Sequence, residues 1–243
     1  MGKWEMVVVE VGGPIWWSGI GLLALMFLLF FTLAPNKSHP KFEGWQKTLG
    51  WIILANQSWY WFMALSDGTF SLRESLPLHM CGLSQFLLFA YLILKQKWAL
   101  PLVAFWGPLG GIQAFLTPAL ETATTVGYVL QFYLAHCAVV VVPLYLILRG
   151  GARLPRRLFW RIIGITNLVG FAVMAVNSML GSNYWYVNQP PPVNHPLVQG
   201  DWPYYLIGLE LAVVVLFLGL YLLLRGHREP VPNVLADEEA KAA

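Results

Sequence analysis

A histidine and a cysteine lie close together in the segment Leu76–Ser84, and this pair is the clearest chemical signal in the sequence. A thiolate beside an imidazole base is the arrangement that nucleophilic acyl transfer requires. On a regular helix, His79 and Cys81 would point to nearly opposite sides, because they are two residues apart. Either the backbone near His79 is not fully helical, since Pro77 suits a first helical turn, or the base is His136.

Cys81 is expected close to the start of a helix, where unpaired N–H groups and the helix macrodipole favour a thiolate. The alternative is an inert, small hydrophobic side chain, which is our interpretation of Cys137. A metal site is conceivable, but no ligand spacing calls for one. The residues that could form it are His79, Cys81, His136 and Glu210. We expect Cys81 to act with His79 or His136, without a metal or a soluble cofactor.

Other polar side chains fall at similar depths in the outer parts of separate apolar stretches or in the loop that follows one of them. Amide and ionisable groups are costly in a bilayer and usually face a bundle interior or a wet cavity. We therefore expect a substrate cavity that opens toward the outer leaflet. The alternative is that each group bonds a neighbouring helix, which is worth about 0.6 kcal/mol on average. The candidate substrate-binding residues are Asn56, Ser84, Gln85, Gln113, Thr117, Asn177, Asn183, Tyr184 and Glu210.

Two features of this set bear on a mechanism. Cys81, Ser84 and Gln85 are spaced i, i+3 and i+4, so a helix would place them on one face. An amide, either Asn56 or Gln113, is expected to help hold an oxyanion in the transition state.

The composition indicates that lipid surrounds these residues. Hydrophobic residues make up 58% of the 243-residue chain and charged residues 11%, whereas a soluble domain carries roughly 25% charge. Stretches of about 20 apolar residues can cross a bilayer as helices. Seven such stretches are present: Pro14–Leu33, Trp45–Leu65, Leu76–Leu94, Trp98–Thr117, Tyr128–Leu148, Leu158–Leu180 and Trp202–Leu224. The predicted fold is an all-α membrane protein with a seven-helix transmembrane bundle.

The basic residues predict its orientation, because Lys and Arg are excluded from short translocated loops. With the N-terminus outside and the C-terminus cytoplasmic, only Lys3 and Arg73 of the 15 basic residues lie outside. Residues 1–228 are predicted to form the transmembrane domain and residues 229–243 a disordered cytoplasmic tail. The net charge of +3 does not indicate nucleic acid. The densest basic run, Arg149–Arg161, is explained by topology and anionic lipid headgroups.

Two further segments carry structural signals. Gly107 and Gly111 form a small-xxx-small pair in the fourth stretch, which lets another helix approach closely. The loop Gly181–Asp201 combines prolines with aromatic residues. It suits a lid on the membrane surface, or simply an interfacial aromatic belt.

Four segments in order resemble the YwaF-like bacterial integral membrane family, which is related to human transmembrane protein 164. These segments are Leu76–Ser84, Gly110–Pro118, Gln131–His136 and Asn183–Tyr186. The animal relatives are regarded as acyltransferases that move fatty acyl chains between phospholipids through an acyl-cysteine. The resemblance implies that Cys81 is this cysteine. It also implies phospholipids and lysophospholipids as partners, and the cell membrane as location.

Two other classes of function compete with an acyltransferase. A small-molecule transporter could use the same cavity as a vestibule, but it would need a polar exit through the inner halves of the helices, which are almost wholly apolar. A non-catalytic lipid-binding protein would keep the cavity without needing a thiol. A rhodopsin-type pigment is excluded, because the seventh stretch has no lysine for a retinal Schiff base.

Overall fold

The computed structural model describes residues 7–120, 125–191, 198 and 200–229. The regular structure of this part of the chain is almost entirely helical, as predicted. The α-helices are α1 (Pro14–Thr32), α2 (Phe42–Ser66), α3 (Met80–Leu92), α4 (Ala99–Leu116), α5 (Val126–Leu148), α6 (Phe159–Leu180) and α7 (Tyr205–Leu223). Short 3-10 helices, η1 (Tyr184–Tyr186) and η2 (Arg225–His227), follow α6 and α7. The strands β1 (Val7–Val8) and β2 (Ala119–Leu120) form one antiparallel pair.

Each predicted apolar stretch corresponds to one helix, but the helices differ in their ability to cross a membrane. Among the described residues, five are long and apolar enough: α1, α4, α5, α6 and α7. The exception in length is α3, whose 13 residues extend only about 20 Å against a hydrocarbon core of about 30 Å. The predicted third span, Leu76–Leu94, was therefore too long at its start, because the chain becomes helical only at Met80.

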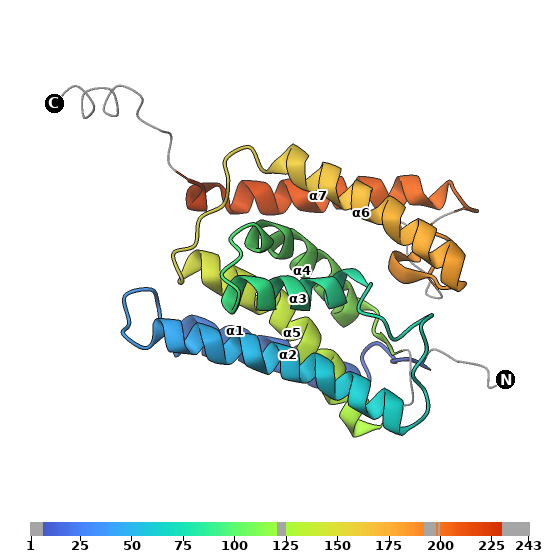
Figure 1. The fold of residues 1–243 in the computed structure, drawn as a ribbon, viewed down its shortest axis with the longest axis horizontal. Coiled ribbons are helices and arrows are strands. Elements are labelled where there is room, and N and C mark those ends of the chain that lie inside the picture. The colour runs from blue at the N-terminus through green and yellow to red at the C-terminus, as the bar shows by residue number, and fades with distance from the viewer. Residues whose placement is uncertain (1–6, 121–124, 192–197, 199, 230–243) are drawn as a thin grey trace.

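Successive helices run in opposite directions, so the connections alternate between two ends of the bundle (Figure 1). The segments between α2 and α3, between α4 and α5, and between α6 and α7 lie at one end. The connections between α1 and α2, α3 and α4, and α5 and α6 lie at the other, and most of the basic residues belong to these connections. We call this second end the basic end.

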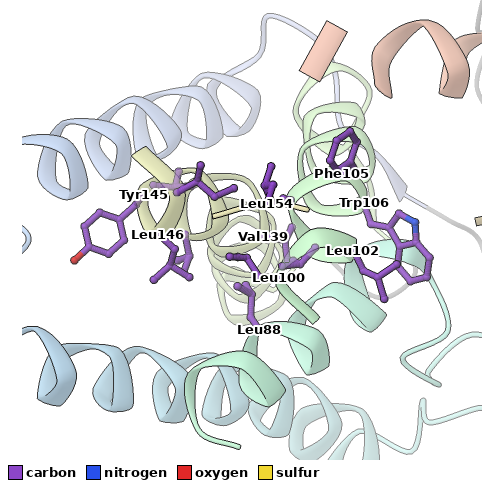
Figure 2. Close-up of a cluster of buried hydrophobic side chains, with 14 of the residues drawn as sticks. Leu88, Leu100, Leu102, Phe105, Trp106, Val139, Tyr145, Leu146 and Leu154 are labelled. Atoms are coloured by element: carbon purple, nitrogen blue, oxygen red, sulfur yellow. The ribbon is translucent and has the colours of Figure 1, made fainter. Parts of the chain in front are cut away.

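The centre of the bundle consists of α3, α4 and α5, and α4 and α5 are its most buried helices. Their aliphatic and aromatic side chains interlock in a dry cluster (Figure 2). A side chain at Gly107 would collide with the carbonyl oxygen of Val139, and one at Gly111 with the side chain of Val140. The predicted close helix approach at the glycine pair is therefore confirmed, and α5 is the partner.

The outer helices enclose this centre from two sides (Figure 1). The α1–α2 pair packs on one side, where α1 contacts α5 and α2 contacts both α3 and α5. The α6–α7 pair covers the other side with fewer contacts, and many of its large apolar side chains are exposed. The predicted tail lies outside the described residues except for Glu229, whose backbone N–H donates to the Leu154 carbonyl.

Candidate active site

A cavity of about 590 Å³ lies between the centre of the bundle and the α6–α7 pair. Seven of the residues singled out in the sequence line it: His79, Cys81, Gln85, Gln113, Thr117, His136 and Glu210. The lining residues come from the later parts of α2 and α4, the earlier parts of α3, α5 and α7, and the middle of α6. Leu88, Leu100 and Leu146 of the buried cluster lie near the other ends of α3, α4 and α5. The lining is therefore drawn from the end of the bundle opposite the basic residues and from the middle of the helices.

Cys81 is the second residue of α3, and its half-buried side chain borders the cavity. Directly before the helix, His79 has an extended backbone with φ −61° and ψ 150°. The expectation that the backbone near His79 is not helical is confirmed, so the objection based on a regular helix does not apply. Backbone N–H groups in a first turn have no acceptor within their helix, and they favour negative charge. The start of α3 therefore suits a thiolate at Cys81.

The two histidines of the cavity are held by different backbone groups. The side chain of His136 is only 7% exposed, and its Nδ1 lies 2.7 Å from the carbonyl oxygen of Phe132, one turn earlier in α5. His79 Nδ1 lies 3.4 Å from the backbone N–H nitrogen of Trp185. The His79 ring also packs against Tyr184 and Tyr186, at centroid distances of 5.0 and 5.7 Å.

A strap formed by residues 183–188 fixes the chain that precedes Cys81. The Trp185 indole N–H donates to the Leu78 carbonyl at 2.7 Å, and the Tyr184 hydroxyl accepts from the Leu76 N–H at 3.0 Å. Trp185 and Tyr186 have φ values of 62° and 55°, a region that costs non-glycine residues about 1–3 kcal/mol each. The strap therefore has a strained backbone at the point where it contacts the site.

Asn177, Asn183 and Tyr184 were predicted to bind substrate, but they do not line the cavity. Asn177 is 1% exposed; its side chain accepts from the Tyr184 N–H and donates to the Tyr184 carbonyl. Asn183 accepts from the N–H groups of Asn188 and Gln189. Their side chains hold the strap together, and Tyr184 connects it to the segment before α3.

Two more predicted residues lie outside the lining. Ser84 is buried and donates to the Met80 carbonyl of its own helix. Asn56 donates to the Gln131 carbonyl at 3.4 Å. For both side chains the structure favours the alternative of a bond between or within helices, so Gln113 is the predicted oxyanion amide that borders the cavity.

The predicted substrate-binding set did not include several polar groups that the cavity brings together. Gln57, buried on α2, accepts from Gln85 at 3.0 Å, and the other amide atom of Gln85, Oε1, is buried without a partner among the described residues. Tyr60, Glu74 and Trp185 also border the cavity. Gln57 was detectable as an amide within an apolar stretch, whereas Glu74 lies in an irregular segment with no pattern that predicts its direction.

The opposite side of the cavity is largely apolar. Six residues of α6 and α7 form this side, which we call the apolar wall: Gly170, Phe171, Met174, Leu209, Val213 and Leu216. Phe171 is 67% exposed and Leu216 43%, so the cavity reaches the outer surface of these two helices. Glu210 is the carboxylate on this side, and it accepts from the Asn167 amide at 3.0 Å.

We call the facing side the polar wall. It consists of Gln57 on α2, His79, Cys81 and Gln85 at or on α3, and His136 on α5. Among the residues that the structure describes, no three His, Cys, Asp or Glu side chains are grouped so that they could hold a metal ion. The arrangement of the polar wall supports nucleophilic chemistry at a thiol, next to an apolar surface that can accept a hydrocarbon chain.

Comparison with known proteins identifies relatives over most of this architecture. The model of the TMEM164 family matches residues 13–221. An uncharacterized protein of Treponema pallidum (strain Nichols) is 29% identical over 164 residues, which is 65% of this chain and 65% of that protein. The matched segment thus spans slightly less than two thirds of that relative. No solved structure matches.

Proposed function

This chain belongs to the TMEM164 family, and from that premise we propose that it is an acyltransferase acting on phospholipids through an acyl-cysteine at Cys81. It is a multi-pass membrane protein, so its substrates can reach it from the bilayer. The observation that carries the proposal is the position of Cys81. This thiol lies in the first turn of α3 and borders the same cavity as His79 and His136.

The proposed first step forms the acyl-enzyme. A histidine takes the proton of the Cys81 thiol, and the sulfur attacks an ester carbonyl of the donor phospholipid. The carbonyl electron pair moves onto oxygen, where donors such as the Gln113 amide stabilise the charge. The intermediate collapses, the lysophospholipid alkoxide leaves with the proton from the histidine, and a thioester remains on Cys81.

The second step transfers the acyl group to an acceptor. The hydroxyl of a lysophospholipid gives its proton to the histidine as its oxygen attacks the thioester carbonyl. The carbon–sulfur bond breaks, and the Cys81 thiolate takes the proton back. Atoms and charges balance without any further reactant, so the reaction is an exchange between two lipids.

The apolar wall supports a lipid substrate in particular. It consists of hydrocarbon and aromatic side chains, and through Phe171 and Leu216 it reaches a surface that bilayer lipid would cover. An acyl chain can therefore lie along α6 and α7 while its ester faces the polar wall. Burial of a hydrocarbon chain contributes about 0.8 kcal/mol per CH₂, but only where it replaces contact with water.

We further propose that all seven helices are embedded in the cell membrane, with the N-terminus outside and the C-terminus in the cytoplasm. The clustering of basic residues at one end supports this orientation, because cytoplasmic loops carry an excess of Lys and Arg. The short α3 is compatible with embedding, because non-helical backbone at membrane depth is tolerated where it is buried in protein or lines a cavity. Ser75, Leu76, Pro77 and His79 line the cavity in this way.

The decisive experiment is to incubate the purified protein with a phospholipid that carries a labelled acyl chain. We expect hydroxylamine-sensitive label on the wild type and on Cys137→Ser, but none on Cys81→Ser. Cys137 is the matched control, because it is the second free cysteine, is fully buried in α5 and does not line the cavity.

Other outcomes would assign the protein differently. Equal labelling of wild type and Cys81→Ser, or labelling of neither under conditions that support acyl exchange, would refute the acyl-cysteine. Solute uptake by proteoliposomes with unchanged lipids would indicate a transporter. A phospholipid bound to both wild type and Cys81→Ala, without exchange by either, would indicate a lipid-binding protein.

A further inference from the structure

The two cavity histidines differ in the hydrogen bond that each one makes at Nδ1. His136 Nδ1 lies 2.7 Å from a carbonyl oxygen, which can only accept a hydrogen bond. This contact requires the hydrogen of the neutral ring to sit on Nδ1, which leaves the lone pair on Nε2. His136 is therefore held as a proton acceptor at Nε2.

His79 has the opposite arrangement. Its Nδ1 receives the backbone N–H of Trp185, and a backbone N–H can only donate. The lone pair of the neutral ring is therefore on Nδ1, and the hydrogen is on Nε2. His79 is held as a hydrogen-bond donor at Nε2.

We propose that the cavity holds His79 and His136 in opposite neutral tautomers and thereby divides the work between them. His136 Nε2 is the general base that takes the proton of the Cys81 thiol and later that of the acceptor hydroxyl. His79 Nε2–H donates to the oxygen that becomes negative in each step. This division of roles rests on the proposed acyl transfer, whereas the two tautomers do not depend on it.

Trp185 is the residue that positions His79. Its backbone supplies the N–H to Nδ1, and its indole N–H holds the Leu78 carbonyl, directly before the histidine. The backbone of Trp185 has a φ of 62°. The indole also packs against Trp106, whose own N–H donates to the buried Thr166. The strap is thus anchored to α4 and α6 while it sets the tautomer of a residue beside α3.

The tautomers can be measured directly by nitrogen-15 NMR of histidine-labelled protein in lipid nanodiscs. Two-bond couplings between ring carbon-bound protons and nitrogens identify which nitrogen carries the hydrogen. At a pH above the titration of both rings, we expect Nε2–H for His79 and Nδ1–H for His136. The other titratable groups that face this cavity are Cys81, Glu74, Glu210 and the tyrosines at 60, 128 and 186. The spectra are therefore recorded over a pH series.

Assignment uses His79→Gln and His136→Gln. If either variant fails to fold, removing His39, His195 and His227 leaves only the two cavity histidines in the chain. Two rings in the same tautomer would then overturn the proposal without any assignment.

Trp185→Phe, which lacks the indole N–H, is expected to mix the two tautomers of His79. Trp160→Phe, at an exposed position on α6, is expected to leave the spectrum unchanged.

Kinetics of the acylation step test the roles. His136→Gln is expected to slow acylation of Cys81 by about 100-fold or more. His79→Asn is expected to cost about 100-fold as well. His79→Gln can place an amide N–H close to the position of Nε2, so we expect it to stay within about tenfold of wild type. A His79→Gln variant as slow as His79→Asn would overturn the donor role.

The two hypotheses fail separately. If the tautomers are opposite but Cys81 is never acylated, the acyltransferase hypothesis is refuted and the tautomer assignment stands. If Cys81 is acylated but both histidines have the same tautomer, the proposed division of roles is refuted and the acyltransferase hypothesis stands.

Discussion

The polar wall and the apolar wall face the same cavity but are built on differently packed parts of the bundle. The polar wall rests on the central helices, where Gly107 and Gly111 let α4 and α5 touch backbone to backbone. The apolar wall rests on α6 and α7, which contact the centre sparsely and expose many of their large apolar side chains. Reacting groups need fixed geometry, whereas a hydrocarbon chain tolerates movement of its surroundings.

The difference extends to how each wall is held. Hydrogen bonds fix the polar wall, including Gln85 to Gln57 and His136 to its own helix. The strap adds bonds to the segment that ends at His79. Beside the apolar wall, Asn167 of α6 donates a hydrogen bond to Glu210 of α7. Four substitutions can test this contrast.

The largest effect is expected at the foundation of the polar wall. In Gly107→Ala the new methyl group meets the Val139 carbonyl, so α4 and α5 must separate. We expect a loss of about 1–3 kcal/mol in the free energy of unfolding, measured by denaturant titration in micelles. Gly219→Ala on α7 is the control: nothing lies within 4 Å of the added atom, so it should be neutral or slightly stabilising. Equal losses at both glycines would contradict the contrast between the walls.

The strap should come next. Asn177→Ala removes the buried amide that bonds both backbone groups of Tyr184, and unpaired buried groups cost about 1–3 kcal/mol. We expect faster hydrogen exchange at residues 183–188 and in the segment before α3. The nearby Met179→Ala, at a position that is 84% exposed, should change exchange much less. Unchanged exchange in Asn177→Ala would show that other contacts hold the strap.

A smaller and more selective effect is expected on the apolar wall. Gly170→Leu places a bulky group opposite Trp185, and it should reduce exchange of long acyl chains about tenfold more than that of short ones. Gly164→Leu on the same helix, where no atom lies within 4 Å of the added carbon, serves as the control. The comparison is a competition assay with a mixture of donors. A uniform loss across chain lengths would argue against an acyl chain on this wall.

The smallest effect is expected at Glu210. Glu210→Gln keeps an oxygen that can accept from Asn167, so a structural hydrogen bonder should tolerate it with less than about a threefold change in the rate of acyl exchange. A loss of tenfold or more would show that the negative charge itself takes part.

The lipid environment and the helix count followed from the sequence, because the transfer of apolar residues into a bilayer depends mainly on composition and on the length of each stretch. Cys81 and His79 could be identified as candidate catalytic residues from the sequence, because a histidine close to a cysteine is a local pattern. The close approach at Gly107 and Gly111 was also predictable, although its partner helix was not.

Tertiary structure alone decided which polar groups face the cavity. Asn177 and Gln85 look alike in sequence, yet one holds the strap and the other borders the cavity. Only the fold brings Trp185 to His79 across more than 100 residues, and only its backbone direction selects the nitrogen that carries the hydrogen. The direction of a side chain and the partner of a hydrogen bond depend on helices distant in sequence, so no local pattern contains them.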